Sequence, residues 1–234
     1  MVKFYNVEIC FIKKLLISFV IIRKKCYNFL MKGKRCFMDY KDKIILLAEK
    51  NNGYITTKEV IKNNIPNIYL TQLVDEGKLL RTSRGLYMFP DCFEDEYYKF
   101  QLTNSNAIFS LETALYLHNF SDRVPIVYNI TVPSNYGGNL LKEKNVNLLY
   151  VKNEFHEIGI TEILSPMGQT IKVYDIERTI CDIIKHKNKV DPEIFSKALK
   201  EYSHYKEKNM NNLIIYARKL NVEDEVRSYM EVML

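Results

Sequence analysis

The chain has 234 residues, of which 47% are hydrophobic and 26% charged, a composition typical of a soluble globular protein. Its length allows one large domain or two smaller ones. The net charge of +6 is concentrated in residues 1–37, which hold nine Lys/Arg and one Glu (+8), so residues 38–234 hold 25 basic and 27 acidic side chains and carry −2. The overall charge is therefore no evidence that residues 38–234 bind nucleic acid. Such binding has to be inferred from local clusters of basic side chains.

The first 37 residues contain an apolar run of eight residues, Leu15–Ile22, with basic residues on both sides. A membrane-spanning helix needs about 20 apolar residues. A signal peptide has its basic residues before the apolar run and a small-residue cleavage site after it. The segment fits neither pattern, although a peripheral membrane anchor stays an alternative. Globular patterning begins after Met38, a suitable start residue, so we predict that residues 1–37 are a mis-annotated or disordered basic extension.

Two short helices are predicted next. Apolar residues fall on one face of a helix over residues 40–52, and Gly53 ends it. Thr56 and Glu59 have the spacing of a capping box for a second helix, which we expect to bury Val60 and Ile61.

A third helix is predicted to begin near Pro66, a residue suited to a first helical turn. Leu70, Leu73 and Val74 are spaced for one buried face of this helix. Gly77 is expected to end it.

A β-hairpin follows the third helix. Residues 78–89 alternate in polarity about Ser83–Gly85, and we expect the tip of the hairpin to carry Arg81 and Arg84.

Three helices and a hairpin in about 50 residues match a winged helix-turn-helix domain, whose third helix enters the major groove of DNA. Asn and Gln can pair with adenine there, while hydroxyls and arginines hold phosphates. The predicted DNA-binding residues are Thr56, Thr57, Asn67, Tyr69, Thr71, Gln72, Lys78, Arg81, Ser83 and Arg84. A protein-binding winged helix stays an alternative, because residues 38–90 hold eight Lys/Arg and six Asp/Glu (+2), and Asp75 and Glu76 would oppose DNA.

Residues 91–234 are predicted to form a second, mixed α/β domain closed by helices, with 17 basic and 21 acidic residues (−4). This charge does not favour a second nucleic-acid surface. Strands are expected within residues 124–133, 146–152, 159–166 and 169–174. Helices are expected to begin within residues 90–101 and after Ser110, Asp175 and Asp191, and to cover 210–220 and 223–233.

Motifs that carry chemistry are missing from the sequence. The five cysteines and four histidines have no zinc-site spacing, and there is no Gly-rich phosphate loop. Cys181 lies on an apolar helix face and is expected in the core. Arg178 and Asp182, four residues apart, are expected to form a surface or helix-capping ion pair. We therefore predict no metal, no cofactor and no catalytic residue, and reduced thiols in a cytoplasmic protein.

Three segments resemble one protein family. They are GYITTKEVIKNNIPNIYLTQLVDEGKLLRTSRGLYMFP, SLETALYLHNFSDRVPIVYNITVP and YDIERTICDIIK. Together they resemble the AbiEi family of antitoxins from type IV toxin–antitoxin (abortive infection) systems, over about residues 40–230. The family pattern often has a glycine near Asn119, which is a departure in this chain.

The resemblance implies an α+β chain with an N-terminal winged helix-turn-helix domain (38–90) and a mixed α/β C-terminal antitoxin domain (91–234). It implies an autorepressor, active in phage defence, that binds inverted repeats in its own promoter. It also implies that the protein counteracts a nucleotidyltransferase-type toxin from the same operon, without a stable complex. Thr57, Gln72, Arg81 and Arg84 would lie on the DNA face.

Arg178 and Asp182 would mark the signature helix of the antitoxin domain, in an unassigned role. The toxin's own nucleotidyltransferase motif is absent from the sequence, which favours the antitoxin. The alternatives are an orphan winged-helix regulator without a toxin partner and a nuclease-like enzyme in the C-terminal domain.

Overall fold

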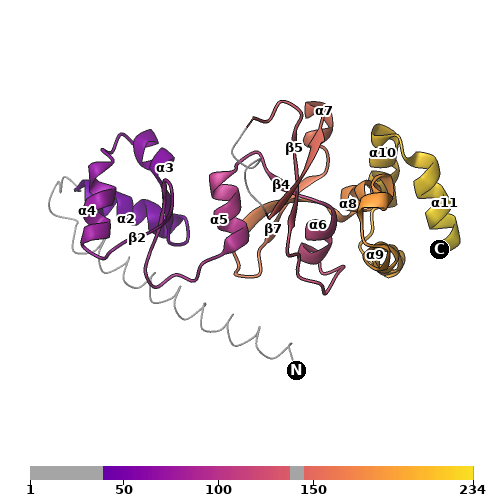
Figure 1. The fold of residues 1–234 in the computed structure, drawn as a ribbon, viewed down its shortest axis with the longest axis horizontal. Helices are drawn as coiled ribbons and strands as arrows, with labels where there is room; N and C mark the ends of the chain where they lie inside the picture. Colours follow the sequence, from indigo (N-terminus) through magenta and orange to yellow (C-terminus); the bar gives the residue numbers. More distant parts are fainter. Residues whose placement is uncertain (1–38, 138–144, 234) are drawn as a thin grey trace, which may run out of the picture.

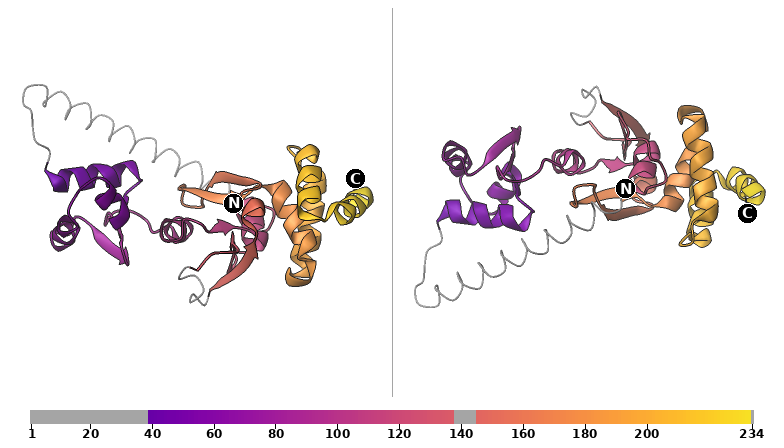
Figure 2. Two further views of the ribbon diagram at one scale, coloured as in Figure 1. Left: turned by 90° about the horizontal axis from the view of Figure 1, so that it is seen from above. Right: turned by 90° about the horizontal axis from the view of Figure 1, so that it is seen from below.

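The computed structural model describes residues 39–137 and 145–233 (Figure 1). An N-terminal domain lies at one end, a five-stranded sheet in the middle and a group of helices at the other end, and the views from above and below show the same row (Figure 2). The predicted basic extension, residues 1–37, lies outside the described residues. Within the described part, no helix has the length and apolar character that crossing a bilayer requires.

The N-terminal domain consists of three helices and a three-stranded antiparallel sheet of order β1-β3-β2. Its elements are α2 (Tyr40–Lys50), β1 (Tyr54–Thr56), α3 (Thr57–Lys62), α4 (Ile68–Asp75), β2 (Leu80–Ser83) and β3 (Leu86–Met88). The three helices and the hairpin occur in the predicted order. Their apolar faces, together with Ile55 and Leu79, form one core.

The predicted capping box begins α3. The Thr56 hydroxyl accepts the backbone N–H of Glu59, and the Glu59 carboxylate accepts the backbone N–H of Thr56 at 2.9 Å. Such a cap satisfies backbone donors that the first turn leaves open. Val60 is buried as expected, but the expectation for Ile61 was wrong, because 57% of it is exposed. The helix has only six residues, and Val60 is the residue of this helix that is buried.

Helix α4 buries Leu70 and Leu73 and leaves Val74 half-buried. Gly77 follows the helix with φ +68°, a left-handed conformation that a glycine adopts without steric cost. The predicted end of this helix is therefore confirmed.

A two-residue turn, Arg84–Gly85, joins β2 to β3, and Gly85 has φ +78°. Arg84 lies at the tip as expected, whereas Arg81 lies within β2, opposite Tyr87, and is not part of the tip. The register shifts between Arg81 and Ser83. The two strands, Leu80–Ser83 and Leu86–Met88, are shorter than the alternating pattern over residues 78–89 predicted.

The second domain contains a mixed sheet of order β6-β5-β4-β8-β7, in which β5–β6 and β4–β8 are parallel pairs. Its elements are α5 (Glu96–Thr103), β4 (Ile108–Phe109), α6 (Leu111–Leu117), β5 (Tyr128–Pro133), β6 (Val146–Val151), α7 (Asn153–His156), β7 (Ile160–Leu164), β8 (Thr170–Tyr174), α8 (Ile176–Lys185), a 3-10 turn (Lys187–Lys189), α9 (Pro192–His204), α10 (Met210–Leu220) and α11 (Glu223–Met233). The four predicted strands and the predicted helices are present. The central two-residue β4 and the four-residue α7 escaped prediction because each spans only about one hydrophobic period, too short for a pattern to repeat.

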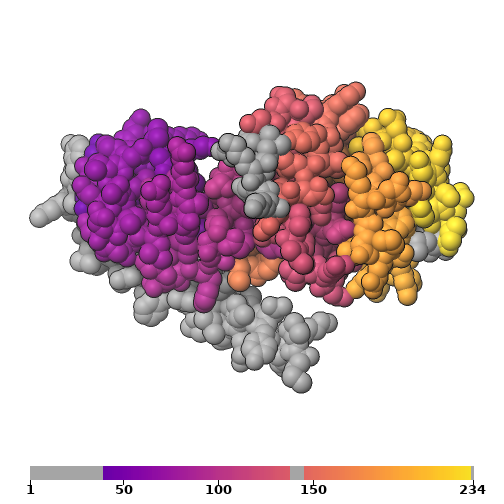
Figure 3. All heavy atoms as spheres, in the orientation of Figure 1, coloured from indigo at the N-terminus to yellow at the C-terminus, as the bar shows by residue number. Residues whose placement is uncertain are grey.

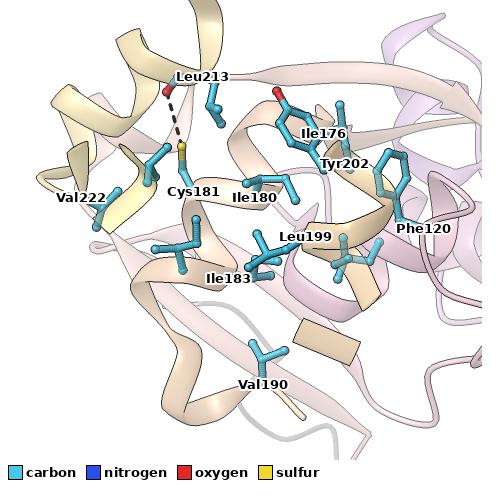
Figure 4. Close-up of a cluster of buried hydrophobic side chains, with 14 of the residues drawn as sticks. Phe120, Ile176, Ile180, Cys181, Ile183, Val190, Leu199, Tyr202, Leu213 and Val222 are labelled. Atoms are coloured by element: carbon cyan, nitrogen blue, oxygen red, sulfur yellow. Dashed lines mark hydrogen bonds between the residues drawn. The ribbon is translucent and has the colours of Figure 1, made fainter. Parts of the chain in front are cut away.

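Helix α8 links the sheet to the terminal helices: it packs on α6, α9, α10 and α11. Its side chains lie in the core shown in Figure 4, where the Cys181 thiol points to the Leu213 carbonyl, 3.6 Å away. The expectation of a core position for Cys181 is confirmed. Asp175 caps α8 by accepting the backbone N–H of Arg178 at 2.8 Å, also as predicted.

Asn119, the departure from the family's glycine, has φ +63°. Asparagine is one of the few residues with a side chain that visits the left-handed region readily. The backbone conformation that a glycine would supply is therefore present at this position.

The two domains meet at a buried junction around Asp95, the cap of α5. The Tyr54 hydroxyl of the N-terminal domain accepts the Asp95 N–H at 2.9 Å, and the Ser165 hydroxyl donates to the Asp95 carboxylate. The Asn52 amide donates to Gln169 at 2.7 Å. These contacts connect the N-terminal domain to the β7–β8 turn, and the space-filling view shows the two lobes joined in this region (Figure 3).

Candidate nucleic-acid interface

Helix α4 presents an outer face that is polar apart from Ile68, which is 58% exposed. Asn67, Thr71 and Asp75 are exposed and Gln72 is half-exposed, because Leu70 and Leu73 occupy the inner face. Asn67 makes no capping hydrogen bond with its side chain. These polar groups are therefore available to a ligand on the solvent side of the helix.

Tyr69 has a different environment from the other predicted residues of this helix. It is half-buried, and its ring lies 5.1 Å from that of Tyr40 in α2. The packing of α4 against α2 thus buries part of the Tyr69 side chain.

A basic hollow of about 410 Å³ lies beside the β2–β3 turn. Lys58 of α3, Arg81 of β2 and Arg84 of the turn all line it, as do Thr56 and Thr57. No Asp or Glu is among the described residues of its wall. The hollow thus combines three positive charges from three elements, and the Glu59 carboxylate lies behind its wall, where it accepts a hydrogen bond from the Thr56 hydroxyl at 2.8 Å.

Gly85 allows this convergence. The Thr57 N–H donates to the Gly85 carbonyl at 2.8 Å, and a Cβ on Gly85 would lie 3.4 Å from the Thr57 hydroxyl oxygen. Because the turn approaches the start of α3 so closely, Arg84 and Lys58 reach the same hollow.

A second hollow of about 560 Å³ also borders the turn. Ser83 and Arg84 line it together with Lys99 of α5 and with Ile126 and Tyr128 of the second domain. Arg84 lines both hollows. The turn therefore lies beside the second domain and is not an isolated protrusion.

Glu76 neutralises two lysines near the end of α4. It contacts Lys41 at 2.5 Å and Lys78 at 2.8 Å, and hydrogen bonds from Lys41 first and Lys78 second lower the pKa of Glu76 to about 2. Lys78, a predicted DNA-binding residue, thus has an acidic partner. Glu76 itself is exposed at the end of α4.

The comparison with protein families applies to the segment that carries these features. Residues 42–90 match the family described as transcriptional regulator, AbiEi antitoxin. The resemblance predicted from the sequence is confirmed over this AbiEi segment. The residues that follow it lie outside the match.

The crystal structure of the RV2827C protein from Mycobacterium tuberculosis is similar to this chain. The TM-score is 0.52 at 11% identity, over 85% of this chain and 83% of that one. At this identity the likeness concerns the fold alone. No curated protein was found to match the chain.

Within the AbiEi segment, seven of the ten predicted DNA-binding residues fall into two sets. Asn67, Thr71 and Gln72 lie on the outer side of α4, and four others line the basic hollow: Thr56, Thr57, Arg81 and Arg84. Tyr69, Lys78 and Ser83 belong to neither set. The Thr56 hydroxyl is already used in the capping box, whereas Ser83 has a buried hydroxyl with no hydrogen-bond partner among the described residues. Sequence reasoning missed Lys58, although its place beside Thr57 in the first turn of α3 was a readable signal.

The signature pair of the second domain differs from the expectation of a surface pair. The side chains of Arg178 and Asp182 are 0% and 2% exposed, and Arg178 Nε donates to Asp182 Oδ2 at 3.0 Å. Arg178 Nη1 donates to the carbonyls of Phe155 and Ile158, at 2.7 and 3.1 Å. The spacing of four residues predicted the pair, but it did not predict the carbonyls of Phe155 and Ile158 that bury it.

Proposed function

We propose that the chain is a DNA-binding transcriptional regulator whose residues 38–90 act as a winged helix-turn-helix domain. The observation that carries the proposal is the AbiEi match over the same segment that contains the outer face of α4 and the basic hollow. The order of three helices and a hairpin supports it. In this proposal α4 enters the major groove and the hollow binds the DNA backbone.

Each set of residues has a distinct task in the proposed complex. Gln72 and Asn67 offer amides that can pair with adenine edges, which gives base preference. Lys58, Arg81 and Arg84 contact phosphates, which gives affinity without sequence information. The inverted repeats expected of an operator would bind two copies of the chain, one on each half-site.

We further propose that the chain represses its own operon and acts as the antitoxin to a nucleotidyltransferase-type toxin in the cytoplasm. The AbiEi match supports a toxin partner. We also propose that the chain counteracts the toxin without forming a stable complex with it and without catalysing a reaction itself. A nucleotidyltransferase gene next to this one would favour the antitoxin over an orphan regulator.

DNA binding is tested with a duplex from the chain's own promoter, by fluorescence anisotropy at several salt concentrations. Each lost phosphate contact lowers the slope of log K against log[salt] by about 0.9, so Arg81→Ala/Arg84→Ala should lower it by about 1.8. The control is Arg218→Ala/Arg227→Ala, which removes two exposed arginines from the terminal helices. An unchanged slope in the first variant would contradict the assignment of the hollow.

Base reading is tested separately with Gln72→Ala. This variant should lose about 1–3 kcal/mol of discrimination against substituted operators while keeping its salt slope. Equal loss on operator and random duplex would remove Gln72 from base recognition.

The antitoxin role is tested by co-expression with the neighbouring toxin. Growth should recover, while affinity purification of the chain should not retain the toxin. A metal-dependent nuclease assay on the purified chain addresses the enzymatic alternative, and reproducible cleavage would overturn the proposal of a non-catalytic protein.

A further inference from the structure

Arg178 has one donor group that its structural contacts do not explain. Nε and Nη1 hold Asp182 and two backbone carbonyls, and the guanidinium carbon lies over the Tyr174 ring, 4.5 Å from its centroid. The buried Nη2 has no hydrogen-bond partner among the described residues. Leaving a buried charged donor unsatisfied is costly, and such groups in native proteins usually have a partner or a function.

Arg178 belongs to the wall of a pocket of about 180 Å³. Arg178 and Asp182 line it together with Lys152, Lys185 and His186. The charged lining residues are thus three basic and one acidic, which leaves +2. The volume is below the range of about 300–1,000 Å³ that is usual for drug-sized ligands, so a small occupant fits best.

The two lysines of the pocket have donors to spare. Lys185 Nζ donates to the Leu220 carbonyl at 2.9 Å, and an ammonium has three donors. Lys152 lies 3.9 Å from Glu154, with both side chains mostly exposed, and such a contact contributes little. Burial first, and then the charges of Lys189, Lys185 and Arg178, lower the pKa of His186, which is consistent with a positive potential at the pocket.

We propose that this pocket binds a phosphate group, with Arg178 Nη2, Lys185 and Lys152 as its ligands. Guanidinium groups match phosphate geometry, and charge-assisted hydrogen bonds are the strong ones. The group can be inorganic phosphate or the terminal phosphate of a nucleotide. This site goes beyond the proposed DNA binding, since it lies in the other domain.

Calorimetry on the full chain tests the site, with inorganic phosphate in one arm and ATP in another. The starting protein is Arg81→Ala/Arg84→Ala, so that the basic hollow contributes less to phosphate binding. Adding Lys152→Gln/Lys185→Gln should weaken binding at least tenfold, while the control Lys187→Gln/Lys219→Gln, which removes two exposed lysines, should not. Tighter binding of ATP than of phosphate would identify the nucleotide as the source.

His186 gives a second, local readout. A bound phosphate should raise the pKa of His186, measured from its C2 proton by NMR and assigned with His186→Gln. No saturable binding, equal binding by both lysine variants, or an unmoved His186 titration would each overturn the proposal. Because Arg178 itself supports the fold, its substitution is not needed for the test.

Discussion

Gly159→Ala is the substitution for which the structure gives the clearest expected cost. Gly159 precedes β7 and has φ +74°, and its carbonyl accepts the Asp175 N–H at 2.7 Å. A Cβ at this position would lie 2.7 Å from Arg178 Cβ and 3.2 Å from its Cγ. Because Arg178 is buried in α8, its Cβ can move only if the helix moves.

Two terms add up in the expected loss of stability. A residue with a side chain in the left-handed region costs about 1–2 kcal/mol, and forcing extra atoms into a packed core costs about 1–3 kcal/mol. We therefore expect Gly159→Ala to lower the free energy of unfolding by about 2–5 kcal/mol. Gly77→Ala is the matched control, because Gly77 has φ +68° with nothing within 4 Å of its added Cβ.

Urea unfolding followed by circular dichroism measures both losses. Since the two glycines lie in different domains, each free-energy change is taken from the transition that the substitution moves. The loss at Gly159 should exceed that at Gly77 by about 1–3 kcal/mol, the overpacking term. Equal losses at the two positions would refute the reasoning, because backbone conformation alone would then explain both.

Three further predictions concern single side chains. Burial raises the pKa of the Cys181 thiol to about 12, so peptide mapping after iodoacetamide treatment should find Cys181 unmodified in the native protein at pH 8 and modified in urea. Burial lowers the pKa of His118 and His156, so the unfolded state binds more protons and the free energy of unfolding should fall as the pH drops below about 6.5. A flat profile between pH 7 and 5 would contradict this. Glu76→Gln should free two lysines near α4, raising the affinity for DNA and steepening its salt dependence, whereas a weaker affinity would show that Glu76 positions α4.

The features that could be predicted from the sequence are local ones. The capping box of Thr56 and Glu59, the cap at Asp175 and the helices over 210–220 and 223–233 each depend on residues within a few positions of one another. The spacing of neighbouring residues is enough to predict such local hydrogen bonds and helical faces.

The features that escaped prediction depend on segments far apart in the chain. Arg178 looks like half of an ordinary i,i+4 pair until Phe155 of α7 and Ile158 after it, 23 and 20 positions away, bring their carbonyls over it. Gly159 belongs to the same contact, and nothing in its neighbours indicates a close approach to a helix. The environment of a charged side chain is a tertiary property, so spacing alone could not distinguish a surface pair from a buried one.

The short β2–β3 turn limits how DNA can be held if α4 reads the bases as proposed. Arg84 lines both hollows beside the turn, and Leu102 and Thr103 of α5 form part of the wall of the basic hollow. A turn of two residues in this position reaches a phosphate strand more readily than the floor of a minor groove. Base preference should therefore come from α4 alone, while the turn and Lys58 bind the backbone beside α5. The buried junction at Asp95 fixes this geometry, so the second domain would determine the direction from which a duplex can approach.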